Sequence, residues 1–255
     1  MNRHVIDLRG WVLPVVLVVL AEAALRVSGI QSEALAKPTE VAGALWEAMA
    51  DGSLFEATAQ TLGAGVGGLL IGCGLGLVIG TWFGLYRRAA HLGFLTVELL
   101  KPIPSVALIP VSMLLFGFGF RMEILVVAFT CFFPMLILTQ SAIAHVEPRL
   151  LEVSQVIGLS NIDRIHKIVL PAVLPRVFVA LRLCVGIALV VSVTVEISAN
   201  PCGLGYGMMI SQQSLRPDLM FAFLLWIGVL GWTLNTAFVR LQSFLFNPLT
   251  LGAGR

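Results

Sequence analysis

Charged residues are scarce in this chain of 255 residues: they make up 12% of it, whereas hydrophobic residues make up 58%. A soluble globular domain usually has about 25% charged and about 45–50% apolar residues. A soluble core cannot bury this much apolar surface. The composition therefore excludes an ordinary soluble domain and predicts a protein whose helices lie in a lipid bilayer.

Several chemical motifs are also absent. The chain has no G-x-x-x-x-G-K-[ST] phosphate loop, so we do not expect it to hydrolyse ATP, and no set of acid, base and nucleophile indicates an enzyme. The sequence GAGVGG at 63–68 matches G-x-G-x-x-G, but it lies in an apolar helix rather than after a strand, so we reject a nucleotide site. A net charge of +2 does not predict nucleic-acid binding. The four cysteines lack disulfide or zinc spacing, so neither a disulfide framework nor a metal site is expected: Cys73, Cys131, Cys184 and Cys202.

Six apolar segments are long enough to cross a membrane as helices, which takes about 17–25 residues each. They are residues 11–27, 62–86, 102–120, 124–143, 172–197 and 219–239. Between the first two, Val41, Leu45 and Met49 recur every four residues, which predicts a short surface helix. The expected fold class is an all-α integral membrane protein with six transmembrane helices.

Six spans leave both termini on the same side of the membrane. Lys and Arg near span ends favour the cytoplasm, and ten lie on the side of the termini against four on the other. The ten are Arg3, Arg9, Arg87, Arg88, Arg149, Arg164, Lys167, Arg176, Arg240 and Arg255, and the four are Arg26, Lys37, Arg121 and Arg216. We therefore expect cytoplasmic N- and C-termini in the cytoplasmic (inner) membrane of a bacterium.

The second segment carries glycines at every fourth position, and these fall on one helix face. In lipid, faces of small residues allow helices to pack closely. We therefore expect a tight helix crossing, in the bundle centre or near a dimer axis, at Gly68, Gly72, Gly76, Gly80 and Gly84.

Prolines interrupt the third segment. Proline removes a backbone donor and strains the preceding helical turn. Pro102 and Pro104 fit either a broken helix that lines a pathway or an interfacial bend before the helix proper, and both alternatives stay open. Pro110 and Pro134 are interpreted as kinks.

The polar stretch 148–171 lies between two apolar segments. Pro148 suits the first position of a helix, and Gly158 suits the left-handed residue that ends it. Ser160 and Asp163 form a capping pair that starts a second helix, which Pro171 either ends or joins to the fifth span. Two short helices joined by a glycine turn are suited to docking in a groove of another protein. The alternative is a loop that packs only on its own bundle.

The same stretch resembles the EAA loop of membrane subunits of binding-protein-dependent ABC importers, whose pattern is E-A-A-x3-G-x9-I-x-L-P. Glu152, Gly158, Ile168, Leu170 and Pro171 are in register, and Val153 and Ser154 replace the two alanines. The segments KPIPSVALIPVSMLLFGFG, ALRLCVGIALVVSVTVEI and GLGYGM are similar to the nitrate/sulfonate/taurine branch of these permeases. The resemblance covers about residues 38–245.

The resemblance implies a type I ABC importer fold and a set of partners. Two copies of the chain would form the pathway, two ATPase subunits would bind ATP and Mg, and a periplasmic or lipid-anchored solute-binding protein would deliver a small anion. This chain would bind no cofactor itself, and its surroundings would be membrane lipid. The residues expected to couple to the ATPase are Glu152, Ser154, Gly158, Leu159, Ser160, Asp163, Leu170 and Pro171.

The resemblance also suggests a domain division, whereas most of the candidate pathway residues are chosen for their polarity within the spans. Residues 1–61 would hold the first span and a periplasmic segment, 62–245 the core permease with its coupling loop at 148–171, and 246–255 a cytoplasmic tail. Ionisable residues inside spans are costly and often functional. The family has an acidic residue where Glu196 stands, before the turn Gly203-Leu204-Gly205-Tyr206, so Glu196 is expected to structure an outer gate by pairing or by hydrogen bonds to that turn, unless it simply reaches water. The candidate pathway or gate residues are Thr130, Arg182, Ser192, Thr194, Glu196 and Asn200.

Arg182 lies inside the fifth span, where three roles stay open: its side chain reaches toward the cytoplasm, binds neighbouring carbonyls or holds an anion. Two other classes of function also remain open. An ion-coupled secondary transporter would need several intramembrane acids and an inverted repeat. A membrane scaffold would account for the glycines but not for the two-helix element at 148–171.

Overall fold

The computed structural model describes residues 9–28, 35–147, 149 and 156–250, and every regular element in these ranges is helical. The elements, in chain order, are α1 (Arg9–Ser28), α2 (Pro38–Ala50), α3 (Ser53–Leu85), α4 (Arg87–Leu100), the 3-10 turn η1 (Ser105–Leu108), α5 (Ile109–Phe116), α6 (Phe120–Ala144), α8 (Asn161–Arg164), the π-helical turn η2 (Ile165–Val169), α9 (Leu170–Ser198), α10 (Leu204–Gln213) and α11 (Pro217–Thr250).

Within the described ranges, four helices are long and apolar enough to cross a membrane: Ser53–Leu85, Phe120–Ala144, Lys167–Ser198 and Pro217–Phe246. They correspond to the second, fourth, fifth and sixth predicted spans, although α3 begins nine residues before the predicted start at Leu62 and α11 continues to Thr250. The first predicted span corresponds to α1, which has 20 residues.

The third predicted span, 102–120, is not a continuous helix, and this prediction was wrong. In its place, α4 and the segment Ser105–Phe116 meet at an angle of 87°. Only if these two pieces are counted as one bent span do the described residues contain a fifth span. The bend falls at the prolines: Pro104 is extended with ψ 124°, and Pro110 lies in the first turn of α5 instead of kinking a helix. Pro134, in contrast, does lie inside α6. The eight residues of α5 extend only about 12 Å at 1.5 Å per residue.

Helices α3, α6 and α9 form the centre of the bundle. Their contact includes a continuous cluster of buried apolar side chains, among them Val127, Met135, Val177 and Ala188. The cysteines at 73, 131 and 184 are buried in this cluster, whereas Cys202 is exposed. Side chains of this size fill the space between helices that approach closely.

The glycine face of α3 lies directly along α6. A Cβ atom added at Gly68 would be 2.5 Å from Val127 Cβ, and one at Gly76 or Gly80 would be 2.6 Å from the carbonyl oxygen of Phe132 or Leu136. At Gly72 it would overlap the Ala128 carbonyl, and at Gly84 it would be 2.7 Å from Ile143 Cβ. All five glycines therefore lie at the α3–α6 crossing in the centre of this subunit.

A second cluster joins α2 to α10 and α11. Buried Ala48, Leu54, Leu204 and Phe223 pack together there, and Trp226 Nε1 of α11 donates a hydrogen bond of 2.9 Å to Thr58 Oγ1 of α3. The predicted surface helix at 41–49 is confirmed as α2, whose first turn closes when Lys37 N–H donates to Glu40 Oε2 at 2.9 Å.

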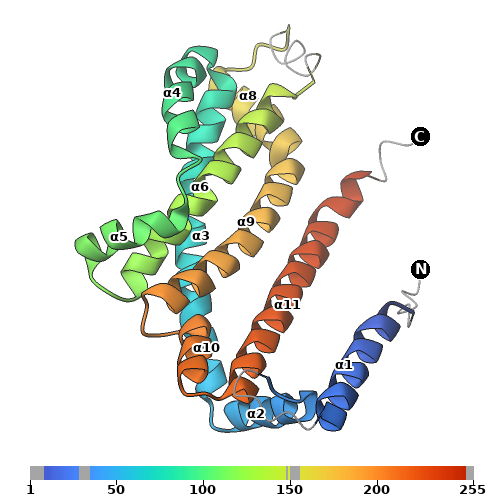
Figure 1. Ribbon diagram of the computed structural model, residues 1–255. Coiled ribbons are helices and arrows are strands. Elements are labelled where there is room, and N and C mark those ends of the chain that lie inside the picture. The colour runs from blue at the N-terminus through green and yellow to red at the C-terminus, as the bar shows by residue number, and fades with distance from the viewer. Residues whose placement is uncertain (1–8, 29–34, 148, 150–155, 251–255) are drawn as a thin grey trace.

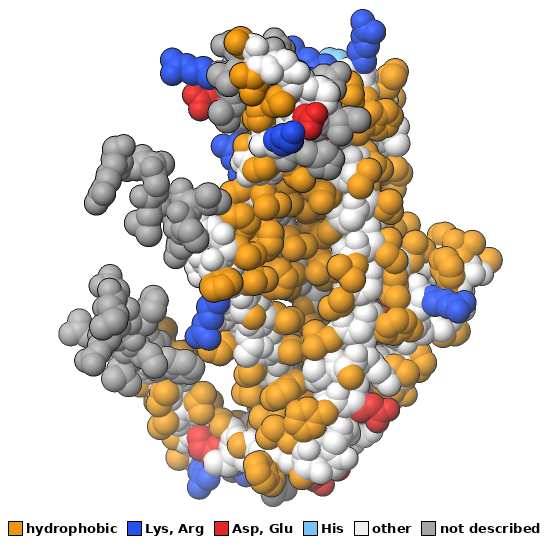
Figure 2. Space-filling model, turned by 180° about the vertical axis from the view of Figure 1, so that it is seen from behind, with side chains coloured by type: hydrophobic (Ala, Val, Ile, Leu, Met, Phe, Trp, Pro, Cys, Tyr) orange, Lys and Arg blue, Asp and Glu red, His pale blue; other side chains and the backbone are white. Residues whose placement is uncertain are grey.

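The bundle has two distinct ends (Figure 1). Helix α8 and the start of α4 lie at one end, and α2 and the start of α11 lie at the other. Most charged side chains on the face drawn in Figure 2 gather near these ends, and the surface between them is mainly hydrophobic. This distribution suits a bundle whose middle contacts hydrocarbon.

Candidate functional site

A glycine turn precedes α8 at one end of the bundle. Gly158 has φ +71°, as predicted for a left-handed residue, and a Cβ added there would meet nothing within 4 Å. Val156 and Ile157 just before it are 87% and 63% exposed. The turn therefore presents apolar side chains outward, on a left-handed backbone that glycine adopts without strain and β-branched residues avoid.

The predicted capping pair after this turn is confirmed. Asp163 N–H donates a hydrogen bond of 3.1 Å to Ser160 Oγ, and Ser160 Oγ–H donates one of 2.7 Å to Asp163 Oδ2. Asp163 also forms an ion pair of 2.8 Å with Lys167. These contacts fix the direction in which the chain leaves the turn.

Helical structure continues from the capped turn into the fifth span. The π-helical turn η2 connects α8 to α9, and Pro171 lies in the first turn of α9, so it joins the span rather than ending the preceding helix. Leu159 and Leu170 are half-buried. Glu152 and Ser154, which the EAA resemblance singles out, lie outside the described residues.

At the opposite end of α9, three predicted gate residues are buried: Ser192, Glu196 and Asn200. Gly205 N–H donates a hydrogen bond of 2.8 Å to Glu196 Oε2, and the Gly203 backbone packs against Glu196 Oε1. Glu196 is 1% exposed. Of the two alternatives, hydrogen bonding to the glycine turn is therefore the one observed, rather than contact with water.

A further residue of this cluster was missed in the sequence. Glu123 of α6 is 1% exposed and accepts a hydrogen bond of 2.6 Å from Asn200 Nδ2. Its position just before the apolar run of the fourth span, beside Arg121, is typical of an interfacial residue. Glu123 is recognisable as part of the site only through its contact with Asn200, which lies 77 positions away in the sequence. No local sequence pattern indicates that contact.

The remaining predicted pathway residues do not join this cluster. Thr130 Oγ1 and Thr194 Oγ1 donate to carbonyls of their own helices, Val126 O at 2.8 Å and Val190 O at 2.7 Å. Their hydroxyls are satisfied locally, which makes them weaker candidates for substrate contact than their polarity suggested.

Arg182, the last of the predicted pathway residues, lies on α9 away from this cluster. Its Nε donates a hydrogen bond of 2.9 Å to Asn235 Oδ1 of α11, and its side chain is exposed in the isolated subunit. It lies about 18 Å along the helix from Leu170, near the middle of the span. Among the described residues, the ion pairs do not include it.

Comparison with known families defines the class of protein. The family described as the binding-protein-dependent transport system inner membrane component matches residues 72–248. This range contains α6, α9, the Gly158 turn and both buried carboxylates. The chain belongs to this family, and it is a multi-pass membrane protein and an ABC importer permease subunit.

Two curated relatives narrow the branch. The chain is 30% identical over 234 residues to the aliphatic sulfonates transport permease protein SsuC of Bacillus subtilis, covering 92% of this chain and 84% of that protein. It is 32% identical over 231 residues to the protein of the same name from Escherichia coli, and the match covers 90% of this chain and 88% of that protein. These similarities place it in the branch that includes sulfonate and taurine permeases.

A solved structure agrees with the fold. Inward-facing conformations of the MetNI methionine ABC transporter superimpose with a TM-score of 0.59 at 20% identity, over 74% of this chain and 92% of the other. The fold is that of a type I ABC importer transmembrane subunit, as the EAA loop predicts.

Proposed function

We propose that two copies of this chain form the translocation pathway of an ATP-driven importer for a small organic anion of the sulfonate class. Membership of the permease family supports the general role. The names of the two similar permeases support the substrate class. A solute-binding protein delivers the anion on the outer side of the cytoplasmic membrane, and the termini lie on the cytoplasmic side.

The Gly158 turn is the proposed contact with a separate ATPase subunit, which binds ATP and Mg. The observation that carries this proposal is the capped, outward-facing turn joined to α9. Its exposed apolar residues suit a groove. The helical connection through η2 makes α9 follow any movement of the turn.

Arg182 is the proposed contact for the anion in the membrane. An arginine near the middle of a span is costly unless it pairs or faces a water-filled pathway. Asn235 holds its Nε, which leaves the outer guanidinium nitrogens free to form the paired hydrogen bonds that sulfonate or carboxylate oxygens accept. A lipid headgroup is a poor partner at this depth, because the hydrocarbon core is about 30 Å thick.

The test uses the permease assembled with its ATPase in proteoliposomes. Gly158→Val forces a β-branched residue into the left-handed region, and we expect ATP hydrolysis to lose its stimulation by substrate-loaded binding protein. Gly158→Asn should retain most of the stimulation, because asparagine tolerates this conformation.

Gly52→Val is the matched control. Gly52 also has a positive φ of 82° and open space around its Cβ position, but it lies between α2 and α3 at the other end of the bundle. We expect this variant to bind the ATPase normally. Normal stimulated hydrolysis in Gly158→Val would refute the coupling role.

A further inference from the structure

Two buried carboxylates meet where α6, α9 and the turn before α10 come together. Glu123 and Glu196 are each 1% exposed, and Asn200, which donates a hydrogen bond to Glu123, lines the same pocket as Glu196. In the described part of the chain, neither carboxylate belongs to an ion pair. Two buried negative charges without a cation would be very unfavourable.

The cluster also lacks hydrogen-bond donors. Asn200 Nδ2 donates a hydrogen bond to Glu123 Oε2, and Gly205 N–H donates one to Glu196 Oε2. The other carboxylate oxygens, Glu123 Oε1 and Glu196 Oε1, are buried without a donor, and so is Asn200 Oδ1. Ser192 Oγ faces Glu123 but forms no hydrogen bond of normal geometry. A protonated carboxyl would supply the missing donor, because its O–H donates whereas a carboxylate only accepts.

The two carboxyl groups differ in their surroundings. Glu196 accepts a backbone N–H from the first turn of α10, and a helix N-terminus favours negative charge. Glu123 accepts a hydrogen bond from the side-chain amide of Asn200, and its other oxygen, Oε1, is buried without a donor. The negative charge therefore belongs on Glu196 and the proton on Glu123.

Other titratable groups around the pair do not neutralise it. Tyr206 of α10 lines the same pocket as Glu196, and Arg121 of α6 is exposed. Cys202 in the turn is exposed as well, and Asp218 of α11 pairs with Arg216 at 3.2 Å. From α3, the neutral Thr61 lies at the turn before α10, where its Oγ1 accepts a hydrogen bond from Leu204 N–H.

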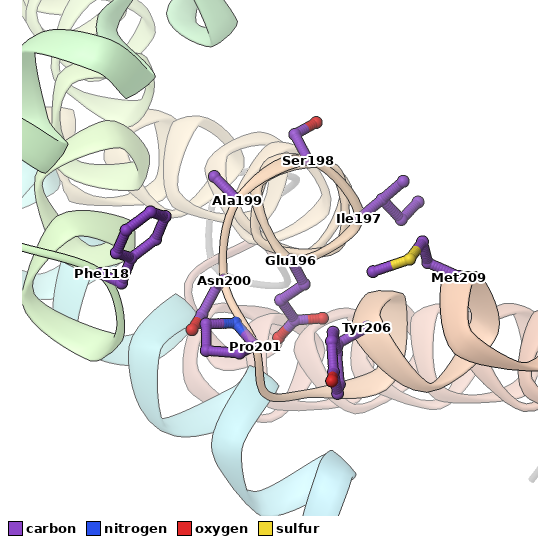
Figure 3. A pocket seen from close by; sticks show the side chains of 9 residues that line it. All are labelled: Phe118, Glu196, Ile197, Ser198, Ala199, Asn200, Pro201, Tyr206 and Met209. Carbon is purple, nitrogen blue, oxygen red and sulfur yellow. The ribbon is translucent and has the colours of Figure 1, made fainter. Parts of the chain in front are cut away.

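An open pocket of about 380 Å³ connects the cluster to the surface. Glu196 and Asn200 form part of its floor, and Phe118 and Met209 form part of its walls. Glu196, Asn200 and Tyr206 point to the same side of the α9 end, whereas Ser198 points away (Figure 3). The pocket therefore brings water up to the Glu196 and Asn200 side of the cluster, at the end of the bundle opposite the Gly158 turn.

We propose that Glu123 and Glu196 form a proton-binding site that holds one proton per subunit on Glu123 and joins α6 to the α9–α10 turn. In the unfolded chain both carboxyls ionise freely. The folded state therefore binds a proton that unfolding releases, and stability falls as pH rises. Between the pH at which the unfolded carboxyl ionises and the higher pH at which the folded site loses its proton, the folding equilibrium constant falls by up to about tenfold per pH unit, and above that range it levels off.

The experiment measures the thermal unfolding of the full-length permease in lipid nanodiscs across pH, at fixed and at varied Na⁺. We expect the wild-type melting temperature to fall as pH rises. Glu123→Gln imitates the protonated carboxyl, so this variant should keep its stability and lose most of the pH dependence. Infrared spectra should contain a protonated carboxyl band that disappears in Glu123→Gln and persists in Glu196→Asp.

Three results would overturn the proposal. A protonated carboxyl band that survives in Glu123→Gln would assign the proton elsewhere. A wild-type melting temperature independent of pH would remove the bound proton altogether, even if the variants fail to fold. A melting temperature that rises with Na⁺ concentration at constant pH would show that a metal cation, rather than a proton, occupies the site.

Discussion

Replacing Gly76 with alanine should separate α3 from α6. A Cβ atom at this position would lie 2.6 Å from Phe132 O and 2.9 Å from Met135 Cβ. Ordinary contacts begin at 3.4 Å, so the helices must move apart by about 0.8 Å, which is 3.4 minus 2.6. The obstacle is a backbone carbonyl, which cannot rotate away as a flexible side chain can.

The magnitude follows from comparison with Gly74, two residues away on the same helix. A Cβ atom at Gly74 would meet nothing within 4 Å. Both substitutions gain the same helix propensity, about 1 kcal/mol, and this contribution cancels in the comparison. Overpacking a close contact costs about 1–3 kcal/mol. Gly76→Ala should therefore be less stable than Gly74→Ala by that amount, roughly fivefold to 150-fold in the folding equilibrium constant.

The assay is the thermal unfolding of both variants in the same detergent, with uptake measured after reconstitution. We expect Gly74→Ala to match or exceed the wild type and Gly76→Ala to melt at a lower temperature. Equal melting temperatures would show that α3 and α6 are not in close contact along the glycine face.

Three further substitutions test the two ends and the middle of α9. Ser160→Ala removes the cap of α8, and we expect a local loss of about 1 kcal/mol, measured as faster hydrogen exchange at residues 158–164; unchanged exchange would contradict the capping role. Arg182→Gln should weaken anion uptake roughly tenfold or more, because a hydrogen bond to a charged group contributes about 1.5–3 kcal/mol. Arg182→Lys should retain part of the uptake. If uptake depends on anion concentration in the same way in the wild type and both variants, Arg182 is excluded from the pathway. Glu196→Gln should reduce uptake while the ATPase still co-purifies, since the charged acceptor of the Gly205 N–H is lost; wild-type uptake would leave Glu196 only a structural role.

Local sequence patterns predicted much of the fold. The turn at Gly158 and the cap at Ser160 each depend on residues a few positions apart, and the structure contains both. The glycine face of α3 follows from helical periodicity alone, although its partner helix does not. The third span was predicted at 102–120, whereas the structure has a bent pair at 87–116, because apolar composition does not distinguish a straight helix from one broken at Pro102 and Pro104.

The carboxylate cluster could be predicted only in part. Glu196 was recognised because a charge inside an apolar run is conspicuous, but Glu123 lies at the edge of its run. Its burial depends on Asn200, which comes from another helix end. Asn200 in turn was predicted to line a pathway, whereas in the structure its amide is used by Glu123. Contacts between distant segments create this site, and the period of one helix carries no information about them.

Helix α9 connects the two candidate sites, so we expect them to act together. It begins at Leu170, which α8 and η2 connect to the capped Gly158 turn, and ends at Ser198, two residues after Glu196; it spans about 43 Å at 1.5 Å per residue. The glycine contacts hold α3 and α6 as a fixed pair, against which α9 packs through small side chains such as Ala180 and Ala188. Movement of the turn would therefore tilt α9 against that pair and move Glu196 relative to Glu123, which belongs to α6. A carboxyl pair that keeps its proton only while buried would lose that proton when the displacement admits water, because water favours the ionised form of both groups.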